Sequence, residues 1–257
     1  MSHAVPILMY HQVSPVAQPA YRKYTVTTRA FAAQMRWLRL AGYTTLTPDA
    51  LQAARLTNRP LPRRPVLITF DDGYADLVTE AVPSLRAAGF TAVFYLIAGL
   101  MGQASEWLRA ERGLVLPLMT WDQARTLAAG GFTCGAHSLS HPRLSDLPAE
   151  ACRHELAESR QRLEAQLNRP VAHLAYPFGA QNAAVRALAA ECGYQTACSV
   201  QIGLSPADDD WLALRRVPVL GTDSLLDFMC RLVSAHTWRD TLNQMRGRLR
   251  PRPAPAP

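Results

Sequence analysis

Residues 66–73 read Val-Leu-Ile-Thr-Phe-Asp-Asp-Gly, a run of apolar and β-favouring side chains that stops at two adjacent carboxylates. Such a run predicts a strand buried on both faces, as in a parallel sheet covered by helices. Because side chains alternate along a strand, Asp71 and Asp72 should leave it in different directions, and Gly73 permits a sharp turn. One acid can then bind a metal while the other moves a proton. An ordinary Asp-Asp-Gly turn before a helix is the alternative on this segment alone.

Strand and helix patterns alternate along the rest of the chain. The other predicted strands are 6–13, 43–46, 91–97, 132–136, 173–176, 195–200 and 214–219. The predicted helices are 28–40, one opening at 47–48, 77–88, 120–130, 148–167, 182–192 and 223–233, and residues 99–118 are predicted as a long loop. This βαβ alternation is typical of a parallel sheet with helical crossovers. Seven or eight strand–helix units favour an α/β fold, a distorted (β/α) barrel of roughly seven strands, over a doubly wound sheet. No G-x-G-x-x-G turn follows a strand, as a dinucleotide-binding sheet would require.

Composition divides the chain into a body and a tail. Residues 1–240 are predicted to form one domain, and residues 241–257, rich in arginine and proline, a disordered tail. The formal net charge is +7, to which four arginines of the tail contribute. Weak attraction of the tail to anionic lipid is one interpretation of this charge. Nucleic-acid binding is not expected, because no folded nucleic-acid-binding motif surrounds the basic segment.

Two further features bear on the compartment. No apolar run approaches the ~20 residues that span a bilayer, and the N-terminus has no cationic region of the secretory type. We therefore expect a cytoplasmic protein, with contact at the inner membrane through the tail as the further option. The five cysteines are odd in number and contain no C-x-x-C, which argues against a disulfide framework and against a thiolate zinc site.

Reactive or unusual groups follow four predicted strands. They are His11, Asp71 with Asp72, His137 with His141, and the turn Pro177-Phe178-Gly179. In a parallel barrel such positions meet at one rim, where active sites lie. Two histidines four apart can converge on one ion if the turn between them is helical, and with one carboxylate they leave positions open for water. A surface loop is the alternative for the histidine pair alone.

The combination of motifs resembles the polysaccharide deacetylase family, also called the NodB-homology or carbohydrate esterase 4 family. The matching stretches are Thr69-Phe70-Asp71-Asp72-Gly73, His137-Ser138-Leu139-Ser140-His141 and Pro177-Phe178-Gly179. The resemblance spans most of the chain from Pro6 to about Leu232. It implies a distorted barrel that uses a divalent metal, usually zinc, to hydrolyse N-acetyl groups of sugars. By position, Asp71 would be the general base, while Asp72, His137 and His141 would hold the metal.

The resemblance also implies further site residues. A main-chain N–H near Phe178 would stabilise the oxyanion, and substrate contacts are expected from Tyr176, Pro177, Phe178, Gly179, Arg215 and Arg216. The family's arginine before Pro-Phe-Gly is Ala175 here, so Arg215 or Arg216 is the predicted replacement that orients Asp71.

The first strand carries a second departure from the family pattern. Residues 7–13, Ile-Leu-Met-Tyr-His-Gln-Val, resemble the branch acting on poly-N-acetylglucosamine, in which a histidine on the first strand is the general acid. That role is predicted for His11. In many family members the general acid is instead a histidine late in the chain. The only late histidine here is His236, which lies near the tail.

The sequence thus predicts a metal-dependent N-deacetylase of an N-acetylhexosamine-containing glycan or glycan precursor, most simply with Zn²⁺. A metal-dependent amidohydrolase acting on a non-sugar amide is one alternative, because the catalytic set recognises the amide bond. A catalytically silent glycan-binding module is the other. The sequence leaves open the sugar, its linkage, the native metal and the oligomeric state.

Overall fold

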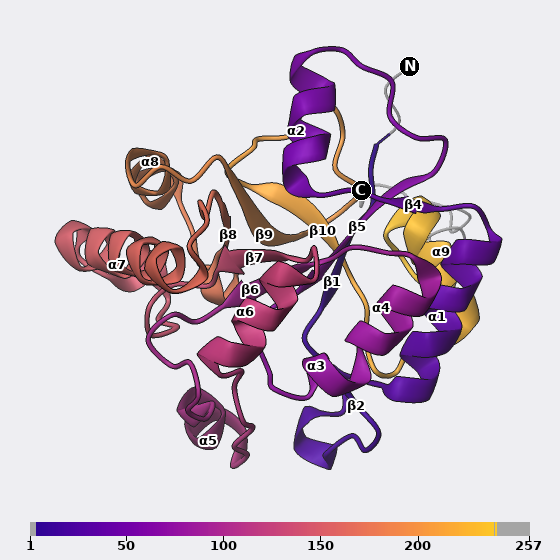
Figure 1. Ribbon diagram of the computed structural model, residues 1–257, viewed down its shortest axis with the longest axis horizontal. Coiled ribbons are helices and arrows are strands. Elements are labelled where there is room, and N and C mark those ends of the chain that lie inside the picture. The colour runs from indigo at the N-terminus through magenta and orange to yellow at the C-terminus, as the bar shows by residue number, and fades with distance from the viewer. Residues whose placement is uncertain (1–3, 239, 241–257) are drawn as a thin grey trace, which may run out of the picture.

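The computed structural model describes residues 4–238 and 240, and the predicted tail lies outside them. Within this part of the chain, seven parallel strands close into a barrel (Figure 1). Their order around the barrel is β1 (Ile7–Tyr10), β10 (Leu214–Pro218), β9 (Thr196–Ile202), β8 (His173–Ala175), β7 (Thr133–Ala136), β6 (Val93–Leu96) and β5 (Pro65–Phe70). The ring closes where β5 pairs with β1, with Leu67 opposite Ile7 and Phe70 opposite Tyr10. The predicted barrel of roughly seven strands is confirmed.

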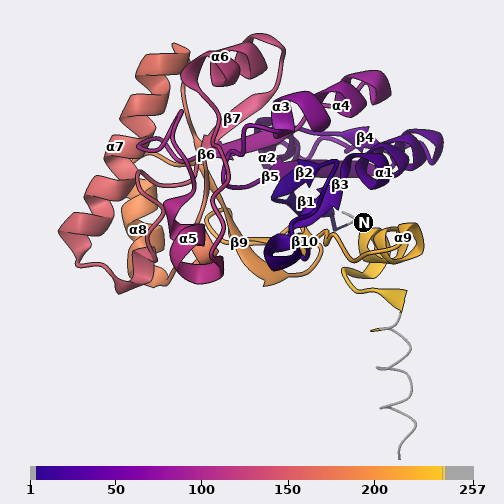
Figure 2. The same ribbon diagram turned by 90° about the horizontal axis from the view of Figure 1, so that it is seen from below.

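Helices lie along the sides and at both ends of the barrel. They are α1 (Thr28–Leu40), α2 (Pro48–Leu56), α3 (Leu77–Glu80), α4 (Val82–Ala88), α5 (Glu106–Arg112), α6 (Trp121–Ala129), α7 (Ala149–Leu167), α8 (Ala183–Glu191) and α9 (Leu225–Ser234). Figure 2 shows α7 and α8 on one side of the strands and α1, α4 and α9 on the other. A capping box opens α6, in which the side chains of Thr120 and Gln123 each accept a hydrogen bond from the other residue's backbone N–H. None of the described helices has the length and apolarity needed to cross a bilayer.

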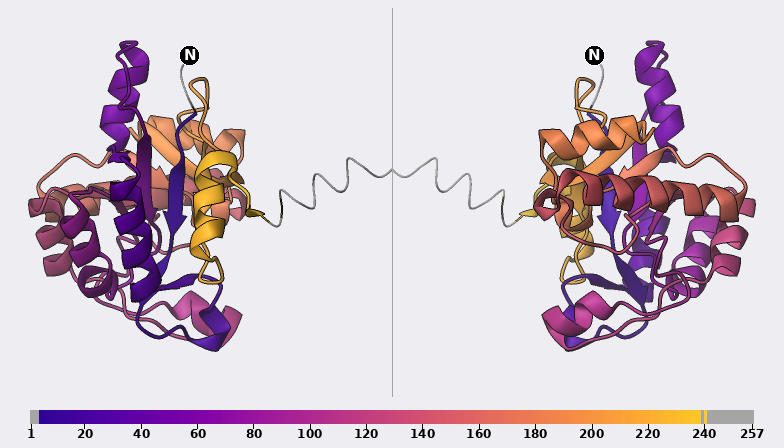
Figure 3. Two further views of the ribbon diagram at one scale, coloured as in Figure 1. Left: turned by 90° about the vertical axis from the view of Figure 1, so that its right-hand side faces the viewer. Right: turned by 90° about the vertical axis from the view of Figure 1, so that its left-hand side faces the viewer.

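Two apolar layers hold the barrel together. Even-numbered residues of β5, such as Val66 and Ile68, belong to the large cluster under the helices, whereas Leu67 faces the barrel interior. The interior cluster also contains Leu51 of α2, which is fully buried at one end of the barrel. Figure 3 shows α2 at the opposite end of the molecule from α5 and from the small parallel pair of β2 (Gln12–Ser14) and β3 (Thr25–Thr27). The strands run toward this second end, which carries the site.

Three predicted elements differ from the observed ones, each for a local reason. The strand at 6–13 is two strands, because the chain leaves the barrel at His11 so that β2 pairs with β3. The helix at 77–88 is split into α3 and α4 next to Pro83. Proline is tolerated in the first turn of a helix but not in its interior, so a new helix starts there. The loop at 99–118 contains α5, a short helix that ends at Gly113 in the left-handed conformation. The predicted short strand at 43–46 is β4 (Thr44–Thr45), at the edge beside β5.

Candidate active site

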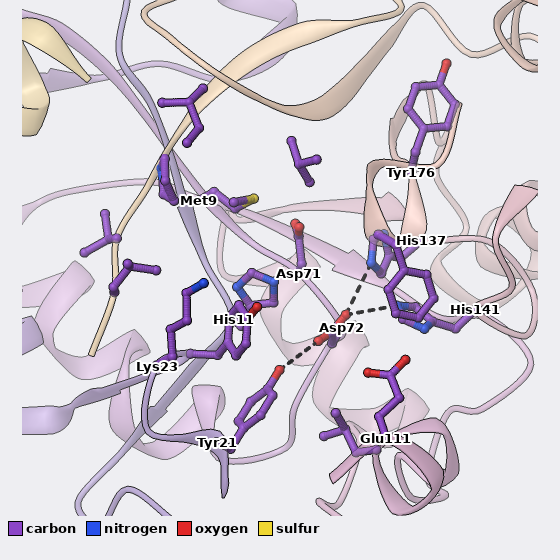
Figure 4. Close-up of a pocket in the computed structure, with 18 of the residues that line it drawn as sticks. Met9, His11, Tyr21, Lys23, Asp71, Asp72, Glu111, His137, His141 and Tyr176 are labelled. Atoms are coloured by element: carbon purple, nitrogen blue, oxygen red, sulfur yellow. Dashed lines mark hydrogen bonds and ion pairs between the residues drawn. The ribbon is translucent and has the colours of Figure 1, made fainter. Parts of the chain in front are cut away.

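Asp72, His137 and His141 meet at the rim of the barrel. Asp72 Oδ1 lies 3.3 Å from the Nε2 atoms of both His137 and His141, and all three side chains are buried (Figure 4). The three atoms lie within 4.8 Å of one another. Burial opposes ionisation of the Asp72 carboxyl, but hydrogen bonding to the two imidazoles outweighs it and holds its pKa well below the usual range. An anionic oxygen and two imidazole nitrogens facing one point form a donor set typical of a divalent metal.

The surroundings of these three side chains fit a metal site. His137 Nδ1 lies 2.7 Å from the carbonyl oxygen of Ala175 and donates to it as N–H, so Nε2 is the ring nitrogen that faces Asp72 and can ligate an ion. The other carboxylate oxygen, Asp72 Oδ2, accepts a 2.8 Å hydrogen bond from the Tyr74 hydroxyl and a 3.4 Å one from Tyr21. Oδ1 is therefore the oxygen left for an ion. Burial, with the charge of Asp72 second, raises the pKa of both phenols, so both stay protonated donors.

The loop that carries His137 and His141 is not helical, although the four-residue spacing was expected to bring the two imidazoles together through a helical turn. Ser138 and His141 adopt positive φ angles of 61° and 67°, a conformation that non-glycine residues rarely hold. The Glu155 carboxylate of α7 holds the loop: it accepts from the backbone N–H groups of Leu139 and Ser140 at 2.9 Å each and from the Ser140 hydroxyl at 2.6 Å. The two imidazoles converge because a buried acid bonds the loop between them.

Asp71 leaves the strand on the other side from Asp72, as the alternation predicts, and pairs with Arg216 of β10. The two N–O distances of this pair are both 2.7 Å. Burial alone would raise the pKa of Asp71, but the charge and hydrogen bonds of Arg216 lower it below its ordinary value. Asp71 is therefore an ionised carboxylate that takes no part in the group formed by Asp72, His137 and His141. Arg215, the alternative partner, points away and lies 3.4 Å from Asp209.

His11 lies in the gap between β1 and β2, half-buried, beside the two acids (Figure 4). Its ring contacts Tyr24, with the two centroids 5.1 Å apart. Burial lowers the pKa of His11, while the charges of Asp72 and Asp71 act in the opposite direction. His236, the late histidine, lines the same cavity.

The turn after β8 supplies a further wall. Phe178 adopts a φ of 57°, and its ring lies 4.7 Å from that of His141. Within this turn, the N–H of Gly179 donates to the carbonyl oxygen of Tyr176, and the N–H of Ala180 donates to that of Pro177. The Phe178 N–H takes no part in these hydrogen bonds. Tyr176 lines the cavity, and its hydroxyl donates to the carbonyl of Leu212. Pro177, Gly179, Arg215 and Arg216 do not line the cavity.

These groups surround a cavity of about 500 Å³. Among the lining residues that the sequence patterns did not single out are Tyr21, Tyr24 and Trp107. Trp107 stacks on His141, with centroids 4.4 Å apart, and comes from the unpredicted helix α5. The tyrosines lie on the segment between β2 and β3, which carries no reactive motif and gives no signal in a single sequence.

Comparison with known proteins agrees with this geometry. A family model described as polysaccharide deacetylase matches residues 58–197, more than half of the chain. YxkH of Bacillus subtilis (strain 168), whose own assignment as a polysaccharide deacetylase is provisional, is 29% identical over 215 residues, 84% of this chain and 71% of that protein. The poly-β-1,6-N-acetyl-D-glucosamine N-deacetylase of Escherichia coli (strain K12) is 34% identical over 87 residues, which are 34% of this chain and only 13% of that protein.

Solved structures show the same barrel. A deacetylase of Streptococcus pyogenes, PplD, in complex with acetate, superposes with a TM-score of 0.80 at 26% identity over 90% of this chain and 99% of that one. IcaB of Ammonifex degensii superposes with a TM-score of 0.70 at 25% identity over 84% and 91% of the two chains. With the matched family model covering both the acid pair and the histidine pair, this chain belongs to the polysaccharide deacetylase family.

Proposed function

We propose that this protein is a metal-dependent hydrolase that removes N-acetyl groups from N-acetylhexosamine residues of a glycan or glycan precursor. The observation that carries the proposal is the division of labour between two adjacent acids. Asp72 faces two imidazoles, whereas Asp71 is held by an arginine and remains free of them. This is the arrangement needed for a Lewis acid and a separate base at one carbonyl.

Asp72, His137 and His141 would hold the ion, for which Zn²⁺ suits the mixture of nitrogen and oxygen donors. When bound, such an ion polarises the amide carbonyl and brings the pKa of water from 15.7 to about 7. The protein's own task is then to move two protons and to stabilise one negative charge.

Asp71 is the base in this scheme. Its lowered pKa keeps it ionised near neutral pH, and two hydrogen bonds from Arg216 fix both of its oxygens in place. It accepts the proton of the attacking water. The N–H of Phe178, which the turn leaves unused, is the proposed donor to the developing oxyanion, an interaction typically worth ~3 kcal/mol.

His11 is the proposed acid. An amine is a poor leaving group unless it gains a proton, and His11 lines the same cavity on the side of Asp71. As an imidazolium it donates its proton to the departing nitrogen, which releases acetate and the free amino sugar. The names of two neighbours support an N-acetyl sugar as substrate: one is a poly-β-1,6-N-acetyl-D-glucosamine N-deacetylase and the other was solved with acetate.

Acetate release tests the function. The purified protein should release acetate from N-acetylglucosamine oligomers, lose this activity with a chelator and regain it with Zn²⁺. Small non-sugar amides, assayed in parallel, test the amidohydrolase alternative, and binding of the oligomers without acetate release would indicate a silent module. Asp71→Asn should keep its zinc by elemental analysis yet lose kcat by ~10³-fold. Asp208→Asn, an exposed acid outside this cavity, is the matched control. Undiminished activity of Asp71→Asn would remove Asp71 as the base.

A further inference from the structure

Two cationic side chains flank one aromatic ring at the mouth of the active-site cavity. Lys23 Nζ lies 5.4 Å from the centroid of Tyr24, and Arg112 Cζ lies 5.1 Å from the same centroid. Both line the cavity and both are exposed. They come from distant parts of the chain, the segment before β3 and the last turn of α5, so the fold itself brings the two like charges together.

Neither cation has a carboxylate partner among the described residues. Arg112 donates to the carbonyl oxygen of Ala20 at 3.4 Å, and the Lys23 ammonium lies over the Tyr24 ring. We call Lys23 and Arg112 the Tyr24 cation pair. A third cation, Arg143, lies over the Phe178 ring at 4.7 Å on the other side of the cavity.

The acids that line the cavity are occupied or face elsewhere. Asp71 is bound to Arg216, and Asp72 belongs to the metal site. Asp240 accepts two hydrogen bonds from Thr237. Figure 4 shows Glu111 on the His141 side of Asp72, whereas Lys23 lies on the His11 side. No ion pair among the described residues therefore neutralises the Lys23 ammonium on the His11 side of the cavity.

The position of this charge relates it to the reaction. Tyr24 contacts both the cation pair and His11, the residue proposed to protonate the departing nitrogen. A group bound by the pair therefore lies on the Tyr24 side of His11. In a 2-acetamido sugar, the substituents nearest to the nitrogen are those on the two neighbouring ring carbons, one of which is the anomeric carbon.

We propose, building on the deacetylase function, that the substrate is an N-acetylhexosamine that carries a phosphoryl group at its anomeric carbon, bound by Lys23 and Arg112. A lysine and an arginine together match the charge and the multiple acceptor oxygens of a phosphate better than those of a single carboxylate. A free sugar phosphate, a nucleoside diphosphate sugar and a polyprenyl-phosphate-linked sugar all present this chemistry. Binding of a neutral glycan polymer would not require the Tyr24 cation pair.

The first experiment compares substrates with the zinc-loaded full-length protein. Acetate release is measured from N-acetylglucosamine 1-phosphate, from its neutral methyl glycoside and from a disaccharide in which a uronate replaces the phosphate. We expect kcat/KM to be at least tenfold higher for the phosphate, and this advantage to shrink as salt is raised. A nucleoside diphosphate sugar and a polyprenyl-phosphate sugar in the same assay identify which phosphoryl source is preferred.

The second experiment assigns the preference to the pair. The double variant Lys23→Ala/Arg112→Ala should lose most of the phosphate-to-neutral ratio of kcat/KM. The control is Arg22→Ala/Arg109→Ala, which removes the same charge from the same two segments at exposed positions that do not line the cavity. It should leave the ratio unchanged.

Three results would overturn the proposal: an equal or better rate on the neutral glycoside, an equal gain from the uronate, or the same loss of preference in the control. Failure of the deacetylase function has a different signature, because none of the sugars would then release acetate. Calorimetric titration with N-acetylglucosamine 1-phosphate still tests the pair in that case. Absence of binding, or equal binding by the double variant, counts against it.

Discussion

Arg216 and Asp71 form a doubly hydrogen-bonded ion pair inside the barrel, with both N–O distances at 2.7 Å. They come from strands that are not neighbours, since β1 lies between β10 and β5. The guanidinium also donates to the backbone oxygen of Ser199 at 2.8 Å and to the Thr69 hydroxyl at 3.2 Å. Arg216 is fully buried and Asp71 nearly so. Arg216 thus contacts Asp71 from another strand than the one on which the family carries its arginine, where this chain has Ala175.

Replacing Arg216 by lysine should disable the base while leaving the metal donors intact. An ammonium cannot make the two parallel hydrogen bonds, so Asp71 loses its fixed orientation and part of its charge compensation. We expect kcat to fall ~100-fold and stability to fall by about 3 kcal/mol, with zinc content unchanged. Steady-state kinetics, urea unfolding and elemental analysis provide the three measurements.

Arg215→Lys is the matched control, because Arg215 is the adjacent residue, half-exposed and paired only with Asp209. Its effect on kcat should stay within twofold. Equal losses in the two variants would show that the pair does not orient the base.

The barrel and the meeting of Asp72 with the two histidines could be predicted from the sequence, because both depend on where strands end. The carboxyl ends of parallel strands share one rim, so Asp72 and His137 had to lie on it once the alternation was recognised. The sequence did not indicate which of Arg215 and Arg216 pairs with Asp71. Both faces of β10 are covered, so no polar–apolar alternation shows which residue faces the interior with Leu214.

Long-range contacts account for what the sequence did not reveal. Glu155 lies in the middle of a helix rich in charged residues, where an acid usually faces solvent, yet it is buried against the histidine loop. Ser138 and His141, both in left-handed conformations, flank the two residues that Glu155 binds. Helix α5 is short and lies between glycines, so its local pattern resembled a loop.

Mutation of His11 separates acid catalysis from the other steps. His11→Gln keeps a polar side chain without a transferable proton, so deacetylation of the sugar amide should fall by ~10²- to 10³-fold. The alkaline limb of kcat/KM should disappear, because the acid has to be protonated and is lost as pH rises through its pKa, which burial lowers. An aryl acetate ester, whose leaving group departs without a proton, should be affected much less. Equal losses on the amide and the ester would assign His11 a structural role.

Tyr74 should determine how tightly the metal binds. Tyr74→Phe removes the hydroxyl that holds Asp72 Oδ2 at 2.8 Å and keeps the ring in the core. We expect the Kd for Zn²⁺, measured by competition with a chelator, to rise 10- to 100-fold. Tyr10→Phe is the control, since its buried hydroxyl donates to Gln34 at 2.9 Å, away from the metal donors. An unchanged Kd in Tyr74→Phe would show that the tyrosine does not position Asp72.

The last prediction concerns Asp76, a carboxyl that lowers stability near neutral pH. Burial raises the pKa of Asp76 to about 6, and although Gln12 Nε2 donates to its Oδ2 at 2.6 Å, its buried Oδ1 has no partner. A pKa raised in the folded state means that the native protein binds this proton more tightly than the unfolded chain does. The resulting stabilisation is fully present below about pH 4 and is lost as pH rises through 6.

Asp76→Asn keeps a neutral side chain at every pH and so removes this pH dependence. Relative to wild type, the variant should gain stability between pH 4.5 and pH 7.5, by about 2 kcal/mol. This value lies below the full effect of the pKa shift, because part of the side chain reaches solvent. Urea unfolding across this range measures the difference, with Asp122→Asn at an exposed position as the control. If the difference between Asp76→Asn and wild type is constant with pH, Asp76 has an ordinary pKa, and the contact between Gln12 and Asp76 does not depend on protonation.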